Sequence, residues 1–378
     1  MFDELRQFAH DADALFDAVA RRLVEAGKLH ELFDLRLMQS RRRLGLPLDR
    51  RGSLDELPEP LRTQTETAYL EACREVGELF VEAGKYREAW MYFRPTGDRG
   101  PVADALSHAI PTDDNIEELI QVALHEGVAA KRGFGWMLGH YGTCNSITTL
   151  EGLAGSLSPA DQQQCAATLV RHLHKELSAN VRAHIERQEG QPPPSEATLS
   201  ELMADRPWLF ANESYHVDTS HLSSTVRFAR LLTDPAAVRL ALELTEYGRR
   251  LSRSLQFPGE EPFVDVFPSH RLFLAATLGE SVDEAVRFFR RKAEEVSIEE
   301  EGTGAVEAYL ILLVRLGRHA EALAEIARLV PEDVALSRYA PSMLELARAS
   351  GAWETYLKIA EARGDMVAYA AGLAESEK

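Results

Sequence analysis

The chain has 378 residues, of which 45% are apolar and 27% charged, and this composition is typical of a globular protein. Its formal charge of −18 disfavours a nucleic-acid partner, because nucleic-acid binding depends on basic side chains that neutralise phosphates. No apolar run approaches the roughly 18 residues of a membrane span, and residues 1–6 lack the basic and apolar stretches of a signal peptide. We therefore expect a cytoplasmic protein without a membrane partner.

Two phrases near the N-terminus have nearly the same sequence. Val24–Leu32 and Val81–Ala89 both begin Val-Glu-Ala-Gly-Lys, and a related phrase returns at Leu316–Ala322. Each phrase follows a helical apolar run, and its glycine can adopt the left-handed conformation that ends a helix at little cost. In the second and third copies, an alanine five positions after the glycine lets the next helix approach closely. The phrase therefore predicts a hairpin of two helices.

The second copy resembles a tetratricopeptide repeat. The residues at that family's characteristic spacings are Gly77, Phe80, Gly84, Tyr86, Ala89 and Phe93, and Leu310, Gly317 and Ala322 fit a further copy. Residues 351–353 and 364–366 look like degraded copies. The copies do not follow the family's regular period of about 34 residues. The resemblance implies a curved, irregular stack of helix pairs with a concave binding surface, and it implies no particular chemistry.

Further helix signals lie between the copies. Thr112 begins a helix that ends at Gly127, Ser158-Pro159 begins one that runs to about Gln188, and Asp234-Pro235 begins a third. Alternating β-branched runs bounded by turns are absent. The sequence therefore predicts an all-α fold, an irregular αα-hairpin solenoid with an elaborated central region.

Irregular segments divide this predicted solenoid. They are rich in proline, glycine or charge, and they lie at residues 45–60, 190–195, 205–214 and 257–263. We predict one continuous solenoid with helical hairpins at 1–127, a central region with long loops at 128–275, and further hairpins at 276–378. Long ordered loops in compact proteins often carry function, so we expect a functional site in the central region.

The strongest candidate site is the pattern His-x-Asp-x-x-His at residues 216–221. It places three metal-binding side chains within six residues, namely His216, Asp218 and His221. On one regular helix the two imidazoles would lie about 140° apart, so we expect His216 in the entering loop and Asp218 as the helix cap. Zinc or another divalent cation accepts such ligands. The alternative is a helix cap with two surface or hydrogen-bonded histidines.

Two further segments of the central region are rich in polar groups. Gly135, Gly139 and Gly142 form a helix stripe that would let another helix pack closely, and His140, Tyr141, Cys144 and Asn145 lie beside it. Buried polar groups need partners, so a site or an internal hydrogen-bond network is expected there. The segment 260–271 combines acidic and aromatic residues with His270 and Arg271. We expect three other histidines, His172, His174 and His184, to be exposed to solvent.

These patterns favour a metal-dependent enzyme that acts on a small polar substrate. His216 and His221 would be metal ligands, with His270 or His140 completing the shell. Asp218 or Glu213 would be a ligand or general base for a metal-activated water, and Tyr141, Tyr215 and Arg271 would hold the substrate. These residues do not distinguish hydrolase, lyase and isomerase chemistry. Familiar phosphate-binding and hydrolase motifs are absent, so the sequence gives no support to a nucleotide-dependent enzyme or a familiar hydrolase.

The alternative function is a non-catalytic interaction scaffold whose central loops bind a partner peptide. A third reading is a homo-oligomer that associates through the apolar run 308–314, although a buried helix explains that run equally well.

Overall fold

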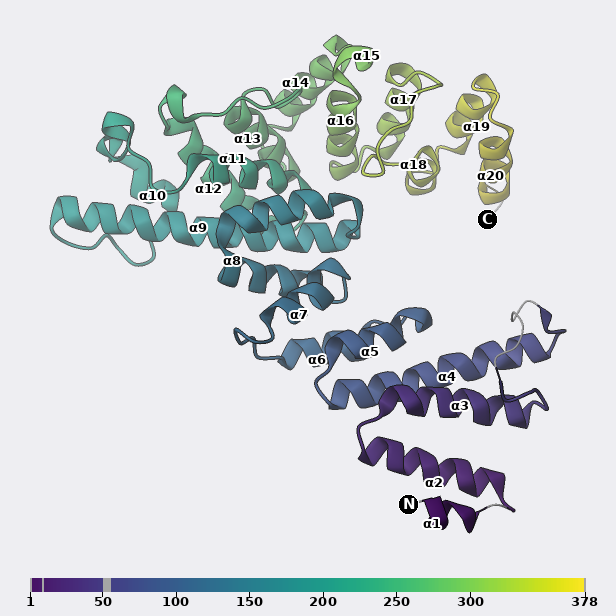
Figure 1. Cartoon of the computed structure of the whole chain (residues 1–378). Coiled ribbons are helices and arrows are strands. Elements are labelled where there is room, and N and C mark those ends of the chain that lie inside the picture. Colours follow the sequence, from purple (N-terminus) through teal and green to yellow (C-terminus); the bar gives the residue numbers. More distant parts are fainter. Residues whose placement is uncertain (1, 9, 50–55, 377–378) are drawn as a thin grey trace. The chain divides into compact units, whose positions relative to one another are not determined.

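The computed structural model describes residues 2–8, 10–49 and 56–376 (Figure 1). It is 73% helical and has no strand in those ranges, so the predicted all-α class is confirmed. Part of the predicted linker 45–60, residues 50–55, lies outside the described residues. Over the described ranges, none of the helices combines the length and the apolar character needed to cross a membrane.

The chain divides into two compact units, one ending at His140 and the other beginning at Tyr141. The division into 1–127, 128–275 and 276–378 was drawn from repeats and loops, and it stays a prediction. The first unit contains α1 (Phe2–Arg6), α2 (Ala12–Glu25), α3 (Leu29–Arg43), α4 (Leu61–Glu82), α5 (Tyr86–Phe93), α6 (Gly100–His108), α7 (Ile116–Ile120) and the start of α8 (Ala130–Gly152).

The first unit confirms the helix hairpins that the repeated phrases predict. Helix α3 packs between α2 and α4, and α4 packs on α5. Gly27 follows α2 with φ +67° and Gly84 follows α4 with φ +69°, so both glycines end their helices in the left-handed conformation. A Cβ at Gly77 would lie 2.7 Å from the Phe93 ring, so this glycine permits the close approach of α5.

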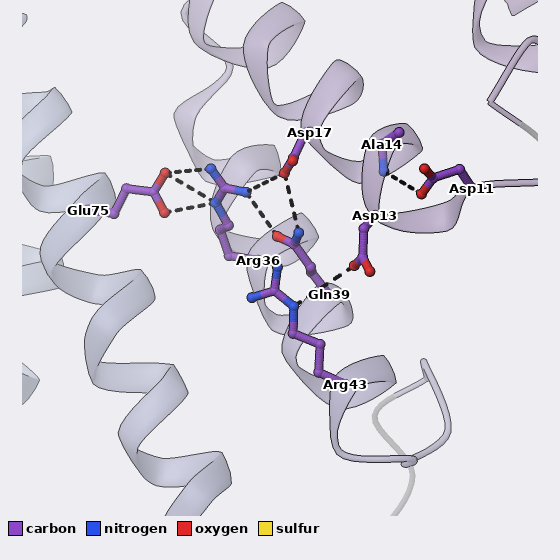
Figure 2. Close-up of polar contacts among 8 residues, drawn as sticks. All are labelled: Asp11, Asp13, Ala14, Asp17, Arg36, Gln39, Arg43 and Glu75. Atoms are coloured by element: carbon purple, nitrogen blue, oxygen red, sulfur yellow. Dashed lines mark hydrogen bonds and ion pairs between the residues drawn. The ribbon is translucent and has the colours of Figure 1, made fainter.

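A polar cluster joins three helices of the first unit (Figure 2). Arg36 of α3 forms a bidentate ion pair with Glu75 of α4, with two nitrogen–oxygen distances of 2.8 Å. Arg36 also donates to Gln39 over 2.9 Å, and Gln39 donates to Asp17 of α2 over 3.4 Å. Since Gln39 is only 3% exposed, these bonds satisfy a buried amide and fix the register of the three helices.

The second unit begins with the rest of α8. Its later helices are α9 (Pro159–Glu189), α10 (Leu199–Ala204), α11 (Thr219–Phe228), α12 (Pro235–Arg250), α13 (Val266–Thr277), α14 (Val282–Glu295), α15 (Ile298–Glu301), α16 (Gly304–Arg315), α17 (His319–Leu329), α18 (Met343–Ser350), α19 (Trp353–Ala362) and α20 (Met366–Ser376). The short 3₁₀ helices η5 (Pro207–Glu213), η6 (Ala229–Leu231) and η7 (Arg253–Leu255) lie in the connections.

The caps predicted for this unit are present. Ser158 accepts the Asp161 N–H at the start of α9, and Asp234 accepts the N–H groups of Ala236 and Ala237 at the start of α12. The long helix α9 packs against α11 and α12, whereas α16 to α20 pack mainly in chain order (Figure 1). The apolar run 308–314 lies in α16 within the core of this unit.

The glycine stripe of α8 does not support close helix packing, so that prediction was wrong. A Cβ built on Gly135 or Gly139 would meet no atom within 4 Å. Gly142 has φ +78° and ψ 176°, and it breaks α8 instead of extending it. The neighbouring polar residues His140, Tyr141, Cys144 and Asn145 are all exposed, so they form no buried network.

Candidate functional site

Three polar side chains of the second unit form one hydrogen-bonded chain. His184 lies on α9, His216 lies in the connection between η5 and α11, and Tyr247 lies on α12. The Tyr247 hydroxyl is 2.8 Å from both the backbone nitrogen and Nδ1 of His216. His216 Nε2 is 2.9 Å from His184 Nδ1. The edge of the Trp208 ring also contacts the His184 ring, with centroids 5.2 Å apart.

The partners of each atom assign the protons along this chain. The Tyr247 oxygen accepts the His216 backbone N–H, so its own proton is available for His216 Nδ1. His216 then carries its proton on Nε2 and donates it to His184 Nδ1. Burial, together with nearby His184 and Arg187, lowers the pKa of His216 to about 4. Burial also raises the pKa of Tyr247, so His216 and Tyr247 are both neutral at neutral pH.

The connection around His216 is held by further bonds. Asn180 of α9 donates to the His216 carbonyl over 2.7 Å. Glu213 accepts hydrogen bonds from Ser254 at 2.6 Å and from Ser252 at 3.3 Å, so it joins this connection to the one that follows α12. Glu213 has φ +57°, a strained conformation for a residue other than glycine, and its two serine partners stabilise it there.

Asp218, one of the predicted ligands, has a structural role. Asp218 caps α11 and accepts the backbone N–H groups of Ser220 and His221, as expected for the entry to this helix. Its carboxylate is thus used by the helix terminus, and its pKa is lowered by a hydrogen bond from the Ser220 hydroxyl together with these two backbone bonds. In the described parts of the chain, no three His, Cys, Asp or Glu side chains form a group that could hold a metal ion. The predicted convergence of His216, His221, His270 and His140 is therefore not seen.

His270 lies in the core on α13 and is 1% exposed. Its Nδ1–H donates to the Val266 carbonyl over 2.6 Å, and its ring stacks on Phe263 with centroids 4.2 Å apart. Burial, with Arg230 nearby, lowers its pKa to about 3, so the ring is neutral. These contacts support the structural role that a lone histidine near a helix start commonly has.

The residues predicted to hold substrate also lie in separate places. The Arg271 guanidinium is 3.6 Å from Glu246, and Tyr215 is 58% exposed in the connection before α11. His140 ends the first unit, and Tyr141 begins the second. Of the predicted set of Asp218, Glu213, Tyr141, Tyr215 and Arg271, the residues Glu213, Tyr215 and Asp218 lie in the same connection as His216, and the role of the set stays a prediction.

The sequence did not identify His184 and Tyr247 as the partners of His216. The prediction that His174 and His184 on α9 are exposed was wrong. His184 is half-buried in the chain described above, and His174 is bonded to Glu243 over 2.6 Å with a side chain only 16% exposed. His184 follows buried Leu177 and Val181 at helical spacing, and this periodicity was a usable signal. Tyr247 likewise follows Leu240 and Leu244 at helical spacing, which indicates its burial but not its bond to His216.

Comparisons with known proteins leave the chain without an assigned family. No family, no curated protein and no solved structure matches it, so its function is inferred from the geometry alone.

Proposed function

We propose that this chain is a non-catalytic interaction scaffold, a stack of helix pairs similar in kind to tetratricopeptide-repeat proteins. The connections of its second unit would bind an apolar segment of a partner peptide. This function corresponds to the alternative that the sequence left open, and it assigns the central loops to recognition and not to catalysis.

Exposed apolar side chains on these connections support the proposal. Tyr215 is 58% exposed, Phe257 48% and Val264 41%. Single exposed hydrophobic residues are ordinary on protein surfaces. These three lie on two connections that Glu213 and Ser254 join by a hydrogen bond, so they belong to one structural feature. Aromatic side chains held in place are the residue type that most often dominates binding energy at interfaces.

The observation that carries the proposal is the set of hydrogen bonds that hold these connections. Tyr247 fixes the backbone of His216, and Glu213 retains a left-handed conformation through its serine partners. A loop that is ordered before binding loses less conformational entropy when its partner docks, so more of the contact energy appears as affinity. Strained backbone of this kind is concentrated at functional sites.

A peptide selection tests this function. A random-peptide phage library is panned against the full chain, and selected peptides are measured by isothermal titration against the double variant Tyr215→Ser, Phe257→Ser. We expect affinity to fall by roughly tenfold or more, because buried aromatic anchors typically contribute over 1 kcal/mol each. The control is Met91→Ser, which removes a 52% exposed apolar side chain from the first unit. Equal binding to the double variant and to the wild type would refute the proposal.

The metal-dependent enzyme remains a second candidate, favoured by the His184–His216 pair. Two imidazole nitrogens lie 2.9 Å apart, close to the separation expected of two ligands on one tetrahedral zinc, roughly 3.3 Å from its usual bond lengths. Its metal ligands would be His216 and His184. Asp218 or Glu213 would be a further ligand or the general base, and Tyr215 would hold the substrate. These three residues lie in the same connection as His216. Tyr247 would orient His216 as an outer hydrogen-bond partner.

Metal analysis separates the two candidates. We expect the purified chain to contain far less than one equivalent of zinc, manganese, iron or copper by plasma mass spectrometry. A structural metal contributes directly to folding, so its removal lowers the melting temperature. A scaffold without metal should therefore keep its melting temperature when chelator is added. Stoichiometric metal that disappears in both His184→Gln and His216→Gln would instead establish the enzyme hypothesis and overturn the scaffold.

A further inference from the structure

Two arginines of the second unit lie together without an acidic partner. Arg230 is in η6 and Arg315 ends α16, and Arg315 donates to the carbonyls of Arg230 and Leu232. Throughout the described ranges, neither guanidinium forms an ion pair with a carboxylate. Other arginines of this unit, such as Arg171, Arg206 and Arg328, each have a carboxylate within 2.7 Å.

Aromatic rings hold both guanidiniums in place. Arg230 lies over the Phe263 ring with its guanidinium carbon 4.9 Å from the centroid, and Arg315 lies over Phe273 at 5.3 Å. Phe263 and Phe273 are themselves in edge contact, with centroids 5.9 Å apart. Stacking on aromatic faces leaves the edges of a guanidinium free for hydrogen bonds. The two cations thus lie over two phenylalanine rings that contact each other.

Helix capping explains Arg315 but not Arg230. Arg315 satisfies two carbonyl groups at the end of η6, which is a common structural use of arginine. Arg230 donates only from Nε, to the Arg227 carbonyl over 3.1 Å, and both of its terminal Nη groups have no acceptor among the described residues. Its side chain is nevertheless exposed, so those donors can reach a ligand from solvent.

The electrostatics of the pair favour an added negative charge. Burial and the charge of Arg230 lower the pKa of Arg315 to about 10. Arg227 and Glu260, which carry opposite charges, also act on the Arg230 guanidinium. Arg227 itself has a carboxylate, Glu151, at 3.5 Å. The unpartnered pair therefore carries a repulsion that an anion between the two guanidiniums would relieve.

We propose that Arg230 and Arg315 form a binding site for an oxyanion, the phosphate or carboxylate group of a ligand. The free terminal nitrogens of Arg230 match the planar, multiply accepting oxygens of these groups, and charge-assisted bonds of this kind are about twice as strong as neutral ones. Arg315, whose terminal nitrogens are bonded to carbonyls, adds its positive charge to the site. The aromatic base of the site includes Phe263, the chain neighbour of Val264 in the proposed peptide surface, but the anion site does not depend on peptide binding.

Titration with two small anions tests the site on the full chain. Inorganic phosphate and succinate are titrated calorimetrically at low millimolar concentration, against sodium chloride of equal ionic strength. Chloride controls for screening of the net charge, and the low concentration avoids the general stabilisation that phosphate produces as a salt. Saturable binding of phosphate, succinate or both is the expected result, and the stronger of the two identifies the preferred group.

Arginine variants then locate the binding. Arg230→Gln should weaken the anion by roughly tenfold or more, the loss expected for one charge-assisted bond, and Arg230→Lys should retain part of the affinity because it keeps the charge but not the fork. The matched control is Arg291→Gln, because Arg291 also lies over a phenylalanine but has Glu295 beside it. Absence of saturable binding, or equal affinity in Arg230→Gln and the wild type, would overturn the site.

Discussion

Replacing Gly248 by alanine is expected to destabilise the second unit by about 2 kcal/mol or more. A Cβ at this position would lie 2.3 Å from two carbons of the Phe267 ring. Phe267 is only 1% exposed, so its ring is enclosed by the core and cannot turn away. Helices α12 and α13 would have to separate, although alanine favours the helix by about 1 kcal/mol relative to glycine. Urea unfolding followed by circular dichroism measures the loss.

The same substitution at Gly152 provides the control. Gly152 lies in the same unit with helical backbone angles, φ −65° and ψ −30°, and a Cβ there would meet no atom within 4 Å. Gly152→Ala should therefore stabilise the unit by a few tenths to about 1 kcal/mol. Equal and favourable effects of both substitutions would show that α12 and α13 do not approach as closely as described.

This pair of glycines illustrates which parts of the fold the sequence predicts. The glycines that end helices, such as Gly27 and Gly84, were predicted because a left-handed residue after an apolar run is a local signal. The close contact at Gly248 has no local signal, since it depends on which helix lies alongside α12. The stripe in α8 had the expected pattern for close packing, yet no helix covers Gly135 or Gly139. Local conformation was therefore predictable, and the choice of neighbouring helix was not.

In the candidate site, too, local features were predictable from the sequence and contacts between distant segments were not. His216 and the capping role of Asp218 follow from residues next to each other in the chain, and both were found from the sequence. The partners of His216 are 32 residues earlier and 31 residues later, on helices that the fold brings together. His221 was the expected partner because it is close in sequence. Hydrogen bonds of a connection are made to whichever elements flank it, and single-sequence patterns do not contain that information.

Replacing Tyr247 by phenylalanine is expected to destabilise the second unit by about 3 kcal/mol. Tyr247 is fully buried, and its hydroxyl bonds both the backbone N–H and Nδ1 of His216. Removing one oxygen leaves two polar groups of the same residue without partners, and each costs about 1–3 kcal/mol when buried. The affinity for selected peptides should fall as well, because the connection that carries Tyr215 loses its anchor.

Tyr309→Phe is the matched control for this prediction. Tyr309 is another fully buried tyrosine of the second unit, on α16, and its hydroxyl has no hydrogen-bond partner among the described residues. Its removal should be neutral or stabilising, because a buried hydroxyl without a partner contributes a desolvation cost only. Similar losses in both variants would show that the Tyr247 hydroxyl does not bond to His216.

The pH dependence of stability gives an independent test of the same bond. The pKa of His216 is about 4 in the folded chain and 6.5 in the unfolded chain, so only the unfolded chain binds a proton between these values. The contribution of His216 to stability is therefore complete above pH 6.5 and decreases as the pH falls towards 4, by up to roughly 3 kcal/mol.

Without the Tyr247 hydroxyl, Nδ1 is free to accept a proton, so the decrease should be shallower in Tyr247→Phe. His270, with a pKa of about 3, adds a similar decrease to every variant and cancels in the comparison. Equal slopes in Tyr247→Phe and Tyr309→Phe, measured by urea unfolding from pH 7 to 4.5, would contradict the proton assignment of the chain.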